Sequence, residues 1–552
     1  MADIEIDEEW CTETIAGLLL LITMMFLNAI QLKEETGSLG TTIKFCFLFP
    51  VIICMVAVML ILQPVFFVYR MVISIKLRNR YGNNFYGLLS GLDVCVNHPV
   101  KQYAMIGILV IFEFDDNAEG QTVLECLKDL VDKNILKDDQ LSRMRTTIKS
   151  YGGYPFLEYV DMKTEDCVKE LPIVDGDLDD AALTRLLGRC QYEPFDGPFL
   201  WDVKVGTQPL QTENDRKRYP VMIRVHHALT DGVTLIQLLA GVLGDKPNGT
   251  VGKHEKLQQQ SQDYLILRLF QFLGKIACVI VYFPSILYSL ALIKKDVNDL
   301  HQKKMGNDEK VALLFDKGGS YFQKVKNIRR LTGASIPEII CTAYSESLKA
   351  HFERYQKKSS RQTTFLLPVV HNPEEIQNMR AMNIKDLNLK NKFSAMTLAI
   401  PFSVEKNGYD GNVPLYCKLQ EVRRRVNMLK RSMEFYVSNV LFHIIAPSFP
   451  GVCLLPFAYF LNNTSIVSLI PGVPKGSYYN GKLVMTDCIF WVPHLMQIDL
   501  AFGSFSYDNR LILSFNCDGL YMSQEMAQEI LEDVYKKIDL LGKELEYLHK
   551  RF

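Results

Sequence analysis

The stretch VHHALTDG, residues 225–232, places two adjacent histidines, an aspartate and a glycine within a few residues of each other. Imidazole has an ordinary pKa of about 6.5, so His226 or His227 could accept a proton at neutral pH. Asp231 is placed to cap a helix expected from Val233, where a carboxylate also suits the helix dipole. Gly232 permits a tight turn and the close approach of a substrate. The motif therefore predicts a general base in a turn.

Two other interpretations of this turn remain open. Both histidines could be structural residues beside an ordinary helix cap, although the whole pattern should arise by chance only about once in a thousand chains of this length. A metal site would need more ligands. The 13 cysteines form no CxxC pair, and no second cluster of histidine, cysteine and aspartate is evident. We expect neither a metal nor a cofactor.

The elements around the turn must hold it in place. The run YPVMIRV before it predicts a short buried strand, and VTLIQLLAGVL after it predicts an apolar helix. Further strands are expected over 103–115, 363–370 and 393–402, and three successive strands near the chain end. Helices are expected over 122–136, 333–355 and 416–432 and from Ser523 onward. This mixture predicts an α/β fold in two halves.

Two apolar stretches lie near the N-terminus, at 14–32 and 45–69. The second has no charge over 25 residues, more than the roughly 20 that a spanning helix needs. The acidic segment before the first stretch argues against a signal peptide, which would begin with basic residues. Four basic residues follow the second stretch and are expected to stay in the cytosol: Arg70, Lys76, Arg78 and Arg80. We expect two spans and a body that faces the cytosol.

Two later apolar stretches, 264–293 and 441–461, contain charged residues or prolines and do not read as clean spans. Segments that dip into one leaflet or wall a lipid tunnel are the favoured interpretation, with true spans as the alternative. The chain thus divides into an anchor (1–80), a first catalytic domain (81–243), a linker with an apolar membrane-associated segment (244–300) and a second domain (301–552). With 61 basic and 62 acidic residues, we expect no nucleic-acid partner.

HHALTDG resembles the HHxxxDG motif of the wax ester synthase/diacylglycerol acyltransferase (WS/DGAT) family, which belongs to the chloramphenicol acetyltransferase-like and condensation-domain group. GLDVCVNHPVKQYAMIGILVIFE and FDGPFLWDVKV are also similar to that family in the first half. FLLPVV, LKNKFSAMTLAIPF and VSLIPGVPKGSYYNGKLV follow in the same order in the second half. The likeness spans most of residues 85–545. It implies two chloramphenicol acetyltransferase-like domains, here with an N-terminal transmembrane anchor.

The sequence departs from the family pattern at two places. The family's asparagine–aspartate pair in the first helix of the second half corresponds to Pro337 and Glu338, and the asparagine before the later Pro-Gly corresponds to Leu469. Both family features are structural, so the departures bear on the interface between the halves more than on the chemistry.

The resemblance implies that His227 is the general base for an alcohol that attacks the thioester of an acyl-CoA. His226 would support the loop or orient the substrate, Asp231 would point away from the cleft and hold the loop, and backbone N–H groups near Gly232 would stabilise the oxyanion. The expected acceptor is a long-chain alcohol or diacylglycerol, and a sterol or an amine remains open. The expected partners also include membrane lipids, and the expected location is the endoplasmic reticulum or a lipid droplet. The competing interpretation is an inactive lipid-binding or lipid-transfer protein.

Overall fold

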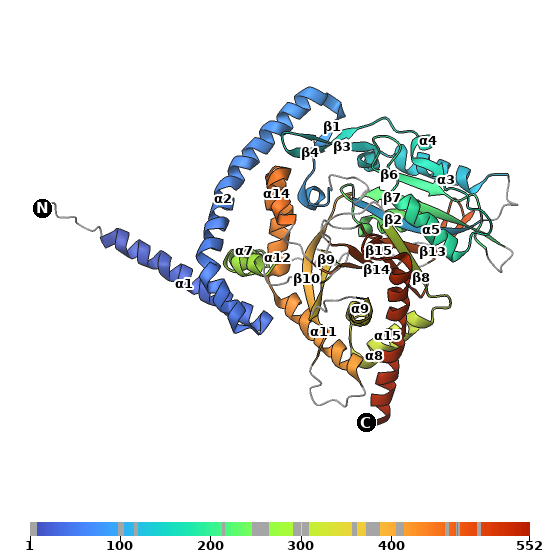
Figure 1. Ribbon diagram of the computed structural model, residues 1–552. Coiled ribbons are helices and arrows are strands. Elements are labelled where there is room, and N and C mark those ends of the chain that lie inside the picture. Colours follow the sequence, from blue (N-terminus) through green and yellow to red (C-terminus); the bar gives the residue numbers. More distant parts are fainter. Residues whose placement is uncertain are drawn as a thin grey trace.

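The computed structural model describes most of the chain, in two sheets with their helices and an apolar N-terminal arm (Figure 1). The described residues are 8–97, 104–114, 120–211, 216–245, 264–290, 298, 300, 309–355, 361–370, 387–404, 413–458, 463–470, 472, 475–493 and 498–551. Several expected features lie outside them in part, including most of the polar linker before residue 264 and the end of the apolar stretch 441–461. The predicted mixed α/β architecture in two halves is confirmed.

The first sheet carries the histidine turn at the end of one of its central strands. Its strands run in the order β12–β13–β2–β7–β6–β5, with the bounds Ser477–Tyr478, Leu483–Trp491, Met105–Phe114, Lys217–His226, Trp201–Val205 and Val168–Glu170. β2 and β7 are antiparallel, and Met105 pairs with His226 at the end of the ladder. Both strands are almost wholly buried, which explains why each reads as a continuous apolar run and not as an alternating one.

Helices and a small sheet complete the first half. The helices are α3, α4, α5 and α6, at Val123–Val131, Thr164–Cys167, Asp180–Gln191 and Gly232–Gln237, and the small sheet has the order β1–β4–β3, at Phe85–Leu88, Tyr154–Tyr159 and Thr146–Tyr151. α3 begins at a reciprocal cap, in which the Thr122 hydroxyl accepts from the backbone N–H of Glu125 and the Glu125 carboxylate accepts from that of Thr122.

The second sheet has the order β10–β9–β11–β14–β15–β8, at Phe393–Pro401, Gln362–Val370, Ser465–Ile470, Leu500–Tyr507, Arg510–Asp518 and Glu309–Phe315. Four helices pack on it and share its core: α8, α9, α11 and α15, at Ser320–Thr332, Ile336–Tyr355, Pro414–Arg431 and Gln524–Arg551. Figure 1 shows α15 running from this sheet to the C-terminus. The three successive strands expected near the chain end are all present.

One hairpin of the second half belongs to the sheet of the first. β12 and β13 follow β11 in the chain, yet β13 pairs antiparallel with β2 over its whole length. Trp491 of β13 is fully buried against Gly107 of β2, where a Cβ atom would overlap the indole ring. The boundary near residue 300 therefore separates the halves in sequence but not in space.

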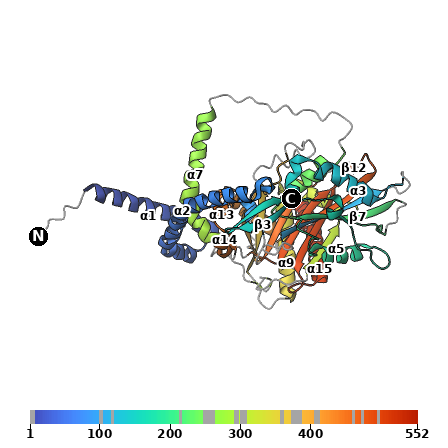
Figure 2. The ribbon, with the colours of Figure 1, turned by 90° about the horizontal axis from the view of Figure 1, so that it is seen from above.

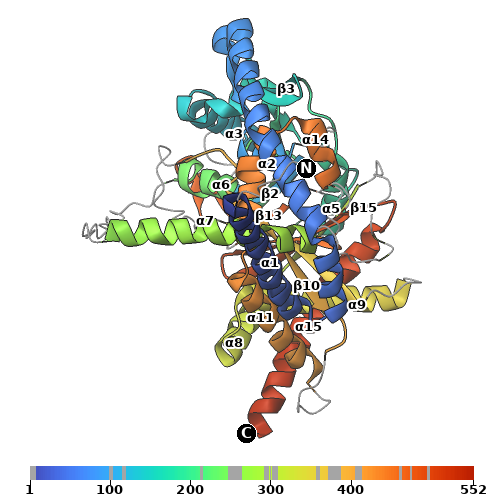
Figure 3. The ribbon, with the colours of Figure 1, turned by 90° about the vertical axis from the view of Figure 1, so that its left-hand side faces the viewer.

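The N-terminal arm consists of α1 (Glu8–Thr36) and α2 (Leu39–Tyr81), and α7 (Tyr264–Tyr288) packs against both. Ala16–Thr36 and Leu39–Asn84 are long and apolar enough to cross a membrane. At 43 residues and about 1.5 Å per residue, α2 is roughly twice as long as the hydrocarbon core is thick. α2 runs along one side of the body, whereas α1 and α7 project away from it (Figures 2 and 3).

Candidate active site

The described residues enclose a cavity of about 1120 Å³ between the two halves and the N-terminal arm. His227, Asp231 and Gly232 lie in its wall, together with residues of β9, β10 and β11 from the second sheet and of α2 from the arm. The rest of the wall is mostly aliphatic and aromatic, and its volume exceeds the roughly 300–1,000 Å³ of ordinary ligand pockets. The shape and lining suit a long apolar substrate.

His227 is the histidine in the wall of this cavity. It follows β7 directly, and its backbone N–H donates to the Ala104 carbonyl at 2.6 Å, so the backbone of the turn is fixed to the chain that leads into β2. The ring packs 5.7 Å from the ring of Phe393, centroid to centroid. Burial lowers the pKa of His227, and hydrogen bonding, together with the negative charges of Asp231 and Asp93, opposes that shift without cancelling it.

His226 faces the interior of the first half. Its side chain is fully buried and is not part of the cavity wall. The ring Nδ1 accepts from the backbone N–H of Ala228 at 3.2 Å, which stabilises the turn. Of the two roles expected for His226, this contact supports the one in the loop, and the cavity contains no part of it that would orient a substrate.

Asp231 is the N-cap of α6. One carboxylate oxygen accepts from the backbone N–H of Thr234 at 2.8 Å, and the other accepts from the backbone N–H of Lys392 at 2.9 Å. The helix cap expected at Asp231 is therefore present, and the second bond joins the turn to the other half of the protein. Asp231 was expected to point away from the cleft, but it contributes to the cavity wall. Gly232 begins α6, and a Cβ atom there would lie 3.0 Å from Cδ1 of Ile470 across the cavity.

A buried group that the sequence reasoning did not single out holds the backbone of the turn. Asp93 accepts from Nη2 of Arg143 at 2.6 Å and from the backbone and side-chain nitrogens of Asn391 at 3.0 and 2.8 Å. Asn391 also donates to the carbonyl of His227 at 2.7 Å, and Arg143 donates to the carbonyl of Ala228 at 2.8 Å. The two carbonyls beside the base are thus held by two donors that share one carboxylate.

These residues were visible in the sequence only as parts of similar stretches. GLDVCVN contains Asp93 and LKNKF contains Asn391, but nothing in one sequence says that residues about 300 positions apart share a contact. The departures at Pro337 and Glu338 fall at the start of α9, where the Glu338 carboxylate accepts from the backbone N–H of Ser335 at 2.7 Å and caps the helix. Leu469 lies on β11 and contributes to the cavity wall.

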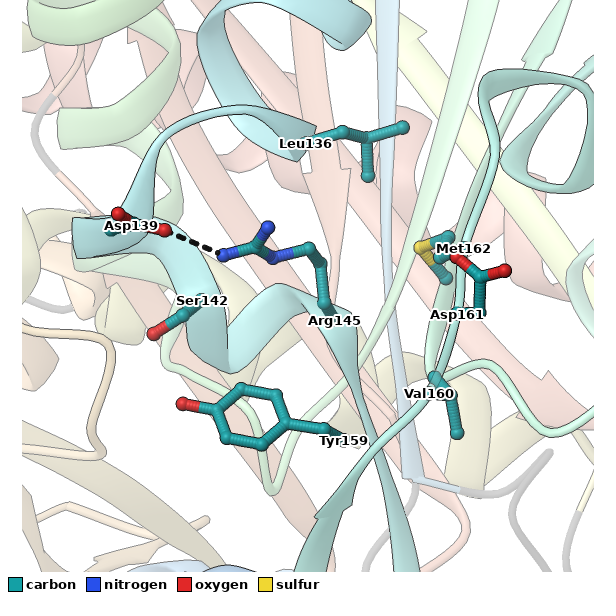
Figure 4. Close-up of a pocket in the computed structure, with 8 residues that line it drawn as sticks. All are labelled: Leu136, Asp139, Ser142, Arg145, Tyr159, Val160, Asp161 and Met162. Carbon is teal, nitrogen blue, oxygen red and sulfur yellow. Dashed lines mark hydrogen bonds and ion pairs between the residues drawn. The ribbon is translucent and has the colours of Figure 1, made fainter. Parts of the chain in front are cut away.

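A second pocket, of about 510 Å³, is lined by Leu136, Asp139, Ser142, Arg145 and residues 159–162 (Figure 4). Arg145 and Asp139 form an ion pair of 3.1 Å across it, and the Asp139 side chain is almost fully exposed. None of the predicted site residues contributes to its wall. Among the described residues, no group of three or more histidine, cysteine, aspartate or glutamate side chains is arranged to hold a metal ion.

Two family models match the chain. The wax ester synthase/diacylglycerol acyltransferase catalytic domain matches residues 214–338, and the WS/DGAT C-terminal domain matches residues 389–541. Together they cover half of the chain, including the histidine turn and Asn391. A comparison with curated protein sequences gave no significant match.

Solved structures share the fold at low sequence identity. A wax ester synthase/diacylglycerol acyltransferase from Marinobacter aquaeolei VT8 aligns with a TM-score of 0.51 at 13% identity, over 81% of this chain and 96% of that one. A trichothecene 15-O-acetyltransferase from Fusarium sporotrichioides aligns with a TM-score of 0.55 at 10% identity, over 83% and 94% of the two chains. The two domains therefore have the expected chloramphenicol acetyltransferase-like fold. With both family models matched in order, the chain belongs to the wax ester synthase/diacylglycerol acyltransferase family of acyltransferases.

Proposed function

We propose that this acyltransferase moves a fatty acyl group from acyl-CoA to a long-chain alcohol and so makes wax esters, with diacylglycerol as a further acceptor. The observation that carries the proposal is the place of His227, a base with a lowered pKa in the wall of a large apolar cavity. The reaction requires a neutral imidazole next to an apolar substrate.

In the proposed mechanism His227 takes the proton of the alcohol hydroxyl as the oxygen attacks the thioester carbonyl. The oxyanion that forms accepts hydrogen bonds from backbone N–H groups at the start of α6, beginning with Gly232. When the carbon–sulfur bond breaks, the imidazolium returns the proton to the leaving sulfur. The products are an ester and free CoA, and the acyl-enzyme step of a nucleophilic mechanism is not needed.

The membrane location is part of the proposal. Two helices that are long and apolar enough to cross a membrane precede the first catalytic strands, and the positive flank after residue 69 favours a body in the cytosol, at the endoplasmic reticulum. Acyl-CoA would then arrive from water and the acceptor from the bilayer. The alternative, an inactive lipid-binding protein, would use the same cavity without chemistry.

Microsomes that contain the wild type or the His227→Ala variant test the proposal. They receive labelled palmitoyl-CoA with either hexadecanol or dioleoylglycerol, and the lipid products are separated. We expect labelled ester with the wild type and a loss of about 10²–10⁴-fold in the variant, as for removal of a general base. His549→Ala, on the exposed face of the terminal helix, is the matched control. Wild-type membranes that form no ester with either acceptor would favour the lipid-binding alternative.

A further inference from the structure

One side of the cavity is formed by α2. Val51, Met55, Val58, Leu62 and Phe66 all contribute to the wall. Their spacing of three or four residues places them on one face of the helix. The same cavity contains His227, so a single apolar space joins the base to a helix that is a candidate to cross the membrane.

The opposite face of α2 is also apolar, and it is exposed. No charge occurs between Lys44 and Arg70, and Leu60 and Phe67 on this face expose 59% and 49% of their surface. A soluble protein rarely leaves such a face uncovered. A helix that is apolar on all sides and borders an apolar cavity suits a place between that cavity and the hydrocarbon of a bilayer.

Next to α2, the cavity wall is built from the helical stretch 441–454, which Pro447 and Pro450 interrupt. A hydrogen bond fixes this stretch to α2: Arg70 of α2 donates to the Pro447 carbonyl at 2.6 Å. Tyr154 donates to the Ser448 carbonyl at 2.7 Å beside the same contact. Farther along, Val452 both contributes to the wall and exposes 70% of its surface, so the cavity reaches the apolar exterior there.

The charged and ionisable side chains of the wall indicate which part of a substrate it can hold. No lysine or arginine occurs among the described residues that form it, so it has no group to pair with the phosphates of a CoA nucleotide. Its ionisable groups, apart from cysteines, are His227 and Asp231, and Asp231 is already bonded to two backbone N–H groups. The α2 side therefore suits an uncharged chain better than the polar end of a thioester.

We propose that the acceptor enters this cavity sideways from the bilayer, between α2 and the stretch 441–454, and that its hydrocarbon chain occupies the α2 side while its hydroxyl reaches His227. This inference rests on the proposed function, because it names the source and the route of the second substrate.

The Val58→Trp variant tests the route in lipid vesicles, because an indole at this position would project into the cavity. Leu60→Trp is the matched control. It lies two residues away and about 200° around the helix, on the outer face. We expect Val58→Trp to lower ester formation from vesicle-borne hexadecanol at least tenfold and Leu60→Trp to change it less than twofold. With butanol, which reaches the site through water, Leu60→Trp should keep the wild-type rate, and Val58→Trp should lose much less activity than it loses with hexadecanol.

Each other outcome has a defined meaning. Equal rates for the two variants with hexadecanol, in a wild type that makes ester, would refute the route and leave the proposed function standing. A Val58→Trp variant that loses both alcohols equally would also refute it. The absence of ester from the wild type would refute the proposed function itself.

Binding of the alcohol can be measured in the wild-type protein without an activity assay. A hexadecanol that carries a diazirine at its far end is placed in vesicles and photolysed, and labelled peptides are mapped. We expect label within 51–66 or 441–454. If palmitoyl-CoA with the same diazirine labels these peptides and the alcohol does not, the cavity side belongs to the acyl donor and the inference is wrong.

Discussion

At the scale of single residues, His226 and His227 are neighbours in sequence with opposite environments. Successive side chains at the end of a strand point to opposite faces of the sheet. One histidine of the pair must therefore face the core when the other faces the cavity. The sequence predicted that the two histidines lie in a turn and that Asp231 caps the helix after it. Periodicity alone does not say which face of the sheet borders the cavity, and the resemblance to the family supplied that assignment for His227.

The lowered pKa of His227 predicts the pH dependence of the reaction. A general base works only when neutral, so activity should persist as the pH falls through about 6.5, the ordinary histidine value, and should be lost only below it, as the ring becomes protonated. The measurement is kcat/KM for acyl transfer between pH 5 and 8. A midpoint above 6.5 would contradict the effect of burial.

Asp93 is predicted to be a positioning residue. The Asp93→Asn variant removes a negative charge that raises the pKa of His227 and leaves Arg143 without its ion pair. We expect kcat to fall at least tenfold with a smaller change in KM, and the acid limb of the pH profile to move to lower pH. Asp139→Asn, which breaks only the exposed pair with Arg145, is the control and should leave the profile in place. A variant with lower kcat but an unmoved limb would show that Asp93 supports folding alone.

At the scale of elements, the sequence predicted the long buried strands and the amphipathic helices, because burial dictates their residue pattern. The sequence did not indicate which residues hold α7 against α1. Asn28 of α1 donates to the Val281 carbonyl at 2.7 Å and accepts from the Ser285 N–H at 3.0 Å. These two groups would otherwise bond to each other in a regular helix. Pro284 lies beside them, and Asn28 bridges the interrupted turn.

We predict that Asn28→Leu loosens the contact between α1 and α7. An interhelical hydrogen bond in an apolar environment contributes about 0.6–2 kcal/mol, and two are lost here. The expected result is a lower midpoint of thermal inactivation in detergent micelles. Thr23→Leu is the control, because the Thr23 hydroxyl is exposed and bonds only within its own helix, to the Leu19 carbonyl at 2.8 Å. Equal midpoints for the two variants would mean that Asn28 does not join the helices.

At the scale of the whole molecule, the halves share a sheet that the sequence does not reveal. The strand 483–491 reads like its neighbours in the second half, and its burial on β2 depends on a pairing across hundreds of residues. Local pattern gives the strand but not its partner, because period-2 burial is the same in either sheet. The histidine turn and the groups that hold it, Asn391 and Lys392 included, likewise come from both halves.

Gly107→Ala is predicted to weaken the joint between the halves. The added methyl would overlap the indole of Trp491, and overpacking of a buried site costs about 1–3 kcal/mol. Gly542→Ala, in α15 with no atom near its Cβ position, is the matched control and should stabilise the protein by about 0.5–1 kcal/mol. Chemical denaturation of the purified protein measures both changes, and a Gly107→Ala variant as stable as the wild type would contradict the close packing of β2 and β13.

The pairing of β13 with β2 also determines when the site can become complete during synthesis of the chain. The ribosome delivers α2 first and β13 more than four hundred residues later, measured by the sequence. Until β13 emerges, β2 lacks its neighbour on one side, and chains with such distant pairings fold slowly. The α2 side of the cavity is thus synthesised long before the opposite side of the site. Under the proposed membrane location, a nascent chain would be inserted in the bilayer before its site is complete, and acyl transfer would begin only after β13 has been translated.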